Sequence, residues 1–111
     1  MIKVAAVSAL SLFASVAFAG VDVTGHITGV QMMPEGLYFA TDIANITTYC
    51  AIRWNGMNMF VPASDPNFPY YYGLVMTAYS KSRTIYLGNI SFFNGTTQCD
   101  LTKTGYGIVS F

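Results

Sequence analysis

Residues 68–87 read FPYYYGLVMTAYSKSRTIYL, and this stretch decides whether the protein is entirely β or contains a helix. Its composition suits a strand, because tyrosine, valine and threonine fit a pleated sheet and glycine costs a helix interior about 1 kcal/mol. The spacing of its apolar residues favours a helix instead. Positions i, i+3, i+4, i+7 and i+8 are apolar, namely Tyr71, Leu74, Val75, Ala78 and Tyr79. We therefore predict a helix over residues 66–82.

The flanks of this stretch contain residues that are common at helix ends. Asp65 offers a side-chain acceptor before the first turn, and the φ angle of Pro66 suits that turn. Lys81 and Arg83 follow the apolar residues and complement the negative end of the helix dipole. The second-ranked interpretation is a small β-sandwich in which the segment is a strand.

The N-terminal residues have the composition of a secretory signal peptide. Lys3 precedes an apolar run that ends in Ala17-Phe18-Ala19, a pattern suited to cleavage. A membrane anchor is the weaker alternative, because the run is short and contains serines. We predict a signal peptide over residues 1–19, a single domain over residues 20–111, and a secreted or periplasmic location.

Charge and cysteine content narrow the class of protein further. Without Lys3 the chain has four basic and five acidic side chains, a net charge near −1, which argues against nucleic acid as a partner. Cys50 and Cys99 are the only cysteines. An even count in an exported chain favours a disulfide, worth about 4 kcal/mol for a loop of this length. Two buried thiols are the alternative.

Five strands are expected around the helix. Residues 21–30 alternate, with Val21, Val23 and Ile27 on one face, and a turn at residues 33–36 leads to residues 37–43. A third strand should cover residues 49–61, and Asn55-Gly56 within it could be a tight hairpin turn or a bulge, of which we prefer the bulge. Residues 84–93 and 105–111 should form the last two strands. The order β-β-β-α-β-β matches the OB-fold, a five-stranded, partly open barrel whose core the helix would cover.

Several of these features resemble a known group of proteins. They are Cys50 ahead of an Arg-Trp strand, Leu74, Ala78, the junction at residues 81–87, and Cys99. Together they resemble small exported bacterial proteins, among them the binding (B) subunits of AB5 toxins of the subtilase-cytotoxin and pertussis-like type. The resemblance implies an OB-fold protomer, a homopentamer, a catalytic A subunit as partner, and recognition of cell-surface glycans, often sialylated. It assigns the family's sugar-contacting serine to no residue of this chain.

The residues themselves do not point to an enzyme. The single histidine, His26, falls on the polar side of the first strand, and the sequence has no GxSxG, HExxH or CxxC motif. Four carboxylates stand in no distinguishing context: Glu35, Asp42, Asp65 and Asp100. We predict a protein that is not an enzyme, with no cofactor and no metal. A small secreted hydrolase would require His26 or one of these carboxylates.

A binding function has more support, because sugar sites combine an aromatic face with amides, hydroxyls and charges. On an OB-fold the usual surface is the outer face of strands two and three with two adjoining loops. The predicted ligand-binding residues are Tyr38, Arg53, Asn55, Asn94, Thr96 and Gln98, with Glu35 and Thr97 nearby. Arg53 would hold an acidic ligand through two hydrogen bonds. Trp54 is expected in the core beside the disulfide.

The helix offers a second surface. Tyr70, Tyr72, Gly73 and Met76 fall outside its predicted buried face. Exposed aromatic and methionine side chains often mark an interface, so we predict that Tyr72 and Met76 contact a neighbouring subunit. The sequence thus predicts an oligomeric glycan-binding module of the AB5 B-subunit type. The alternative is a monomeric exported envelope protein with a stress, adhesion or inhibitor role.

Overall fold

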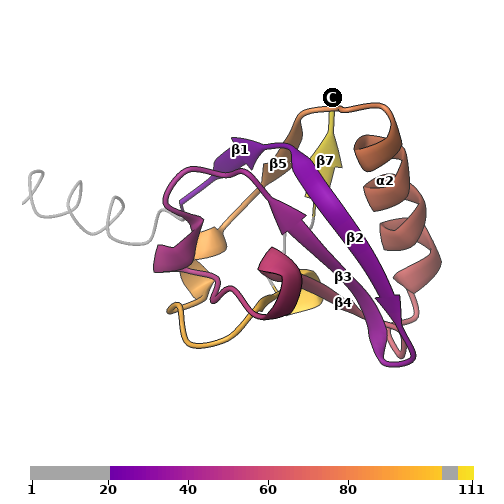
Figure 1. Cartoon of the computed structure of the whole chain (residues 1–111), viewed down its shortest axis with the longest axis horizontal. Coiled ribbons are helices and arrows are strands. Elements are labelled where there is room, and N and C mark those ends of the chain that lie inside the picture. Colours follow the sequence, from indigo (N-terminus) through magenta and orange to yellow (C-terminus); the bar gives the residue numbers. More distant parts are fainter. Residues whose placement is uncertain (1–20, 104–107) are drawn as a thin grey trace, which may run out of the picture.

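The computed structural model of the protein is described here for residues 21–103 and 108–111. The predicted signal peptide and the beginning of the predicted last strand lie outside this range. The described part is mainly β with one α-helix, as predicted. Its strands form a three-stranded sheet in the order β1-β5-β7 and a four-stranded sheet in the order β2-β3-β4-β6 (Figure 1).

The elements are short. The strands are β1 (Val23–Gly25), β2 (Ile27–Met33), β3 (Gly36–Thr41), β4 (Met59–Pro62), β5 (Ile85–Leu87), β6 (Cys99–Asp100) and β7 (Ile108–Ser110). The helix is α2 (Phe68–Ser80), and the 3-10 turns are η1 (Ile46–Thr48), η2 (Trp54–Gly56), η3 (Ile90–Phe92) and η4 (Leu101–Lys103).

The first predicted strand is divided between the two sheets at His26. The N–H of His26 donates to the Asp42 carboxylate at 2.6 Å, and the Asp42 N–H donates to the His26 carbonyl at 3.1 Å. A side chain thus replaces a strand partner, and the chain passes from β1, which pairs with β5, to β2, which pairs with β3. The described residues thus form two sheets of shorter strands, and the predicted five-stranded, partly open barrel of continuous strands is not confirmed among them.

The hairpin between the first two predicted strands is confirmed. Met33 pairs with Gly36 across a two-residue turn. The alternation that follows is also confirmed, because Leu37, Phe39 and Ile43 are all buried in the main core.

The third predicted strand is much shorter than expected. Only Met59–Pro62 forms β4. Asn55 has a left-handed backbone (φ 56°), and the Arg53 N–H donates to the Met57 carbonyl at 3.0 Å, so Asn55-Gly56 belongs to a tight turn rather than to a bulge. This turn places Trp54 40% exposed, outside the core predicted for it.

The predicted helix is confirmed. It covers Phe68–Ser80, so it is two residues shorter at each end than the predicted range of 66–82. Asp65 accepts a hydrogen bond from the Asn67 N–H at 2.8 Å, which stabilises a turn ahead of the helix, and Asn67 instead occupies the cap position. At the other end Ser82 has a left-handed φ of 51°, and the Arg83 N–H donates to the Ala78 carbonyl at 2.9 Å. This left-handed residue stops the helix.

The buried face of α2 is narrower than predicted. Val75 and Ala78 are buried, and Tyr71 and Leu74 pack against the core as partly buried residues. Tyr79 is 40% exposed, so its assignment to this face was wrong. The helix contacts β2, β4 and β7, and in Figure 1 it stands beside the β2–β3 hairpin.

The fourth predicted strand also ends early, at Leu87. Asn89 has a left-handed φ of 56°, and its N–H donates to the Asp22 carboxylate at 3.0 Å. The chain therefore turns into η3, which directs Ile90 into the core.

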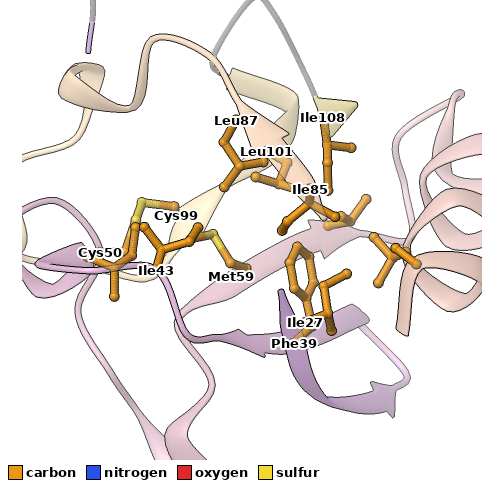
Figure 2. Packing of buried hydrophobic residues seen from close by; sticks show 14 of the residues in the cluster. Ile27, Phe39, Ile43, Cys50, Met59, Ile85, Leu87, Cys99, Leu101 and Ile108 are labelled. Carbon is orange, nitrogen blue, oxygen red and sulfur yellow. A yellow bond between two sulfur atoms is a disulfide. The ribbon is translucent and has the colours of Figure 1, made fainter. Parts of the chain in front are cut away.

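One continuous core joins the two sheets and the helix (Figure 2). The predicted disulfide between Cys50 and Cys99 is confirmed, with a Cα–Cα distance of 5.1 Å, and both cysteines are fully buried. Met59 pairs with Cys99 in the parallel β4–β6 ladder, so the bridge fixes this two-residue edge strand. Figure 2 shows the bridge beside Ile43 and Met59.

Candidate binding surface

The outer face of the four-stranded sheet carries one row of side chains from four strands. Because side chains alternate along β3, Tyr38 points away from the face that buries Leu37 and Phe39. The register aligns Gln31 with Tyr38, Tyr38 with Phe60, and Phe60 with Asp100. This row crosses β2, β3, β4 and β6.

Three aromatic rings meet on this face, and we call Tyr38, Trp54 and Phe60 the aromatic cluster. The centroid of the Tyr38 ring lies 4.6 Å from the centroid of the Phe60 ring and 5.1 Å from that of the Trp54 ring. The Tyr38 and Trp54 rings meet edge-on. Tyr38 is only 7% exposed, whereas Trp54 is 40% exposed. Tyr38 therefore supports the cluster, and Trp54 offers an aromatic surface to solvent.

The turn η2 holds Trp54 in this place through backbone hydrogen bonds. The Met57 N–H donates to the Trp54 carbonyl at 3.1 Å, and Met57 itself is buried beside Tyr38 and Ala40. The Gln98 amide donates to the Met57 carbonyl at 2.9 Å. The indole is thus mounted on a short, braced turn.

Polar side chains surround the aromatic cluster. The Asn55 amide donates to the Gln31 side-chain oxygen at 3.3 Å, which connects the turn to the edge strand β2. The Tyr38 hydroxyl donates to a Glu35 carboxylate oxygen at 3.3 Å. Burial and the Glu35 charge raise the pKa of Tyr38, and the positive charge of Arg53 opposes that shift. One acidic and one basic side chain therefore act on the same phenol.

The predicted ligand-binding residues lie in two different places in the structure. Tyr38, Arg53 and Asn55 belong to the aromatic cluster or its surroundings, although Arg53 lies in a loop and not on a strand. Gln98 approaches the same region through Met57.

Asn94 and Thr96 belong to a separate loop and bond to each other. The Thr96 hydroxyl donates to the Asn94 side-chain oxygen at 2.6 Å. The loop is attached through the Gly95 N–H, which donates to the Tyr49 carbonyl at 2.9 Å. These two residues therefore stabilise a turn next to η1.

Two residues of this surface were missed by the sequence analysis as binding candidates, Trp54 and Phe60. Phe60 could have been found, because its position between Met59 and Val61 places it on the opposite face from two buried side chains. Trp54 could not, because its exposure depends on the left-handed turn at Asn55.

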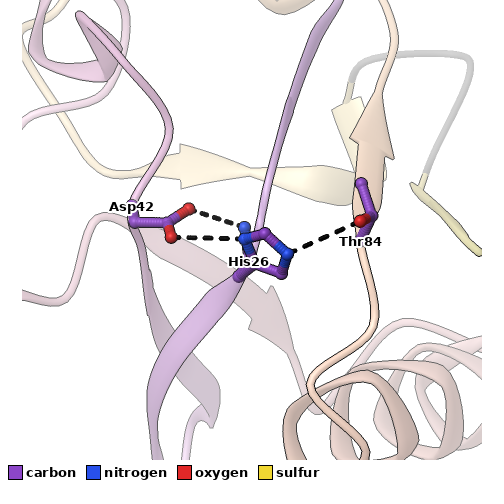
Figure 3. A network of polar contacts seen from close by, with 3 residues as sticks. All are labelled: His26, Asp42 and Thr84. Atoms are coloured by element: carbon purple, nitrogen blue, oxygen red, sulfur yellow. Dashed lines mark hydrogen bonds and ion pairs between the residues drawn. The ribbon is translucent and has the colours of Figure 1, made fainter.

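A second polar group lies where the two sheets meet (Figure 3). His26 Nδ1 lies 3.3 Å from Asp42 Oδ2, and His26 Nε2 lies 3.5 Å from the Thr84 hydroxyl oxygen. Figure 3 shows the imidazole between the other two side chains. The group thereby connects the β1–β2 junction, the end of β3 and the residue before β5.

The order carboxylate, imidazole, hydroxyl is that of a nucleophile activated by a general base. Catalytic groups of that kind work in a site shielded from water. The His26 and Asp42 side chains are 50% and 48% exposed, and the contact to Thr84 is at the outer limit for a hydrogen bond. The geometry therefore supports a role in holding the sheets together.

Within residues 21–103 and 108–111, no three histidine, cysteine, aspartate or glutamate side chains are grouped so that they could hold a metal ion. Over the same residues, no helix has the length and hydrophobicity needed to cross a bilayer. No protein-family model, no curated protein and no solved structure matches the chain.

Proposed function

We propose that the protein is an exported carbohydrate-binding module that holds a sugar ring against Trp54. The observation that carries the proposal is a half-exposed indole fixed on a buried tyrosine and surrounded by hydrogen-bonding side chains. The apolar face of a sugar packs on an aromatic ring, and nearby amides and charges bind its hydroxyl groups. The Gln31 and Asn55 amides bond to each other beside the indole, and a carboxamide has further donor and acceptor positions that can bind a sugar.

The charges around the cluster favour an acidic sugar. Arg53 precedes Trp54 and is exposed, and its guanidinium can hold a carboxylate through two parallel hydrogen bonds. Glu35 is already engaged by the Tyr38 hydroxyl. We therefore propose sialylated glycans as the first class of ligand to test.

The sheet order supports the OB-fold as the finer description of the fold. β1 and β2 follow each other directly, as the first strand of a barrel would when it passes from one sheet to the other. The third predicted strand, β4, pairs with β6 in parallel, and β5 pairs with β7. In that fold the last strand pairs with both the third and the fourth, and we propose that β6 and β7 share this place, although only β7 belongs to the predicted last strand.

The disulfide supports export, because such bridges persist mainly in oxidising compartments. We accordingly propose a secreted or periplasmic protein, and we propose that it has no catalytic activity. The homopentamer and the catalytic A subunit rest on the resemblance to AB5 B subunits alone.

A glycan array tests the proposal. We expect the exported protein to bind a subset of sialylated glycans, and Trp54→Ala to lose at least about fivefold in affinity, since an aromatic contact of this kind is worth about 1 kcal/mol or more. The matched control is Tyr70→Ala, which removes an aromatic ring that is 78% exposed on α2, away from the cluster.

Three outcomes would contradict the proposal. They are binding that Trp54→Ala leaves unchanged, binding that Tyr70→Ala reduces equally, and no binding to any glycan. The last result, together with a monomeric native mass, favours the envelope protein with a stress, adhesion or inhibitor role.

A further inference from the structure

We propose that two copies of the protein associate through α2, with the two helices antiparallel, in place of the homopentamer that the resemblance to AB5 B subunits implies. The helix has 13 residues and no acidic, basic or histidine side chain. A helix that is apolar on most sides is normally buried on most sides. Here the fold of one chain buries only two of its residues fully, Val75 and Ala78.

Three of the incompletely buried apolar residues form one line along the helix. Tyr72, Met76 and Tyr79 are spaced i, i+4 and i+7, which places them on the same side. We call these three residues the α2 stripe. Tyr72 and Tyr79 are 41% and 40% exposed, and Met76 is partly buried. The stripe adjoins the side of the helix that faces the core, so it extends an apolar surface that the chain leaves half covered.

The charges at the two ends of α2 indicate that a second copy of the protein covers the α2 stripe. Asp65 precedes the helix, and Lys81 and Arg83 follow it, so an uncharged helix separates opposite charges. When two such helices pack antiparallel, each acidic end meets the basic end of the partner. The two helix dipoles are then also opposed, which is the favourable arrangement. A parallel pair would place like charges together.

The small size of the surface indicates a weak association. A helix of this length is about 20 Å long, so a pair of helices buries less than the roughly 1,200 Å² at the lower end of stable interfaces. We therefore expect a dimer that dissociates on dilution, with a dissociation constant on the order of micromolar. The stripe lies on a different element from Trp54, so the inference does not depend on the proposed sugar site.

Sedimentation velocity of the exported protein over a dilution series tests the association. The expected result is a monomer–dimer equilibrium that Met76→Glu weakens at least about a hundredfold, because an unpaired charge would be buried between two apolar helices. Tyr70→Glu is the matched control. It introduces the same charge in the same helix, at a position about 100° or more from each stripe residue, and should leave the dissociation constant within about threefold.

A charge swap tests the antiparallel orientation. Asp65→Lys alone, and Lys81→Glu with Arg83→Glu, should each associate at least about fivefold more weakly than the unchanged protein. An equimolar mixture of the two variants should form a mixed dimer, because opposite charges then face each other again. Circular dichroism of each variant confirms that the helix is intact.

A monomer at every concentration overturns the inference. A pentamer, a dimer that Met76→Glu leaves unchanged, or charge variants that fail to pair in the mixture while remaining folded would also overturn it.

Discussion

Removing the Cys50–Cys99 disulfide should have the largest effect on stability of any change at the edge of the four-stranded sheet. The bridge closes a loop with a sequence separation of 49 residues, which contains β4, α2 and β5. Restricting the unfolded chain by a loop of that length is worth about 4 kcal/mol at 25 °C. That is a large part of the 5–15 kcal/mol that usually separates a folded domain from its unfolded state.

The bridge should also stabilise β6 locally. β6 has two residues and pairs with β4 through Met59–Cys99 and Phe60–Asp100 alone. Without the covalent bond, this short ladder must hold an edge strand by itself. We expect the amide hydrogens of Cys99 and Asp100 to lose protection before those of β3.

Urea denaturation of the oxidised protein and of the same protein under reducing conditions measures the effect. The reduced wild-type protein is the better comparison, because Cys50→Ala with Cys99→Ala would also remove two fully buried side-chain sulfurs. We expect the free energy of unfolding to fall by about 4 kcal/mol on reduction. A change below about 1 kcal/mol would refute the loop-entropy reasoning.

Two further predictions concern backbone conformation and acid stability. Gly56 and Gly95 both have a left-handed φ, 74° and 82°, but a Cβ at Gly56 meets nothing within 4 Å, whereas one at Gly95 lies 2.8 Å from the Thr48 carbonyl oxygen. Gly56→Ala should therefore cost about 1–2 kcal/mol by thermal or urea denaturation, and Gly95→Ala clearly more; equal losses would contradict the close contact. The second prediction concerns Asp22, whose pKa is lowered by hydrogen bonds from the Tyr86 hydroxyl and the Asn89 N–H. Because its carboxyl binds a proton more weakly in the folded state, its contribution is present above the usual carboxyl range and is lost as the pH falls through the lowered pKa. Stability measured across acid pH should thus depend less on pH in Tyr86→Phe, and an unchanged profile would count against this role.

The parts of the fold that follow local rules were predictable from the sequence. Leu37, Phe39 and Ile43 alternate with outward residues, and all three are buried. Val75 and Ala78 fall on the predicted helical face, since a period of 3.6 residues is visible in the sequence itself.

The interruptions of the strands were not predictable in the same way, because they depend on contacts between distant residues. The first strand is divided where the Asp42 carboxylate takes the N–H of His26, 16 residues away. The fourth strand ends where Asn89 bonds to Asp22, 67 residues away. No local pattern encodes these pairs.

The binding surface was predictable in part. Alternation placed Tyr38 on the outer face, which is correct, but it did not show that Trp54 and Phe60 cover it. Asn94 and Thr96 have the residue types of a sugar site, yet their first partners are each other. Residue type indicates what a side chain can bind, whereas its neighbours decide what remains available.

The most direct test of the carbohydrate proposal is the fluorescence of Trp54, the only tryptophan in the chain. Titration of the exported protein with a sialylated oligosaccharide should shift its emission in a saturable way, because the sugar covers the indole. A matched asialo oligosaccharide should give a much weaker response, and Arg53→Ala should remove most of the difference between the two. Glycan binding that leaves the emission of Trp54 unchanged would show that the sugar lies elsewhere, and would contradict the account.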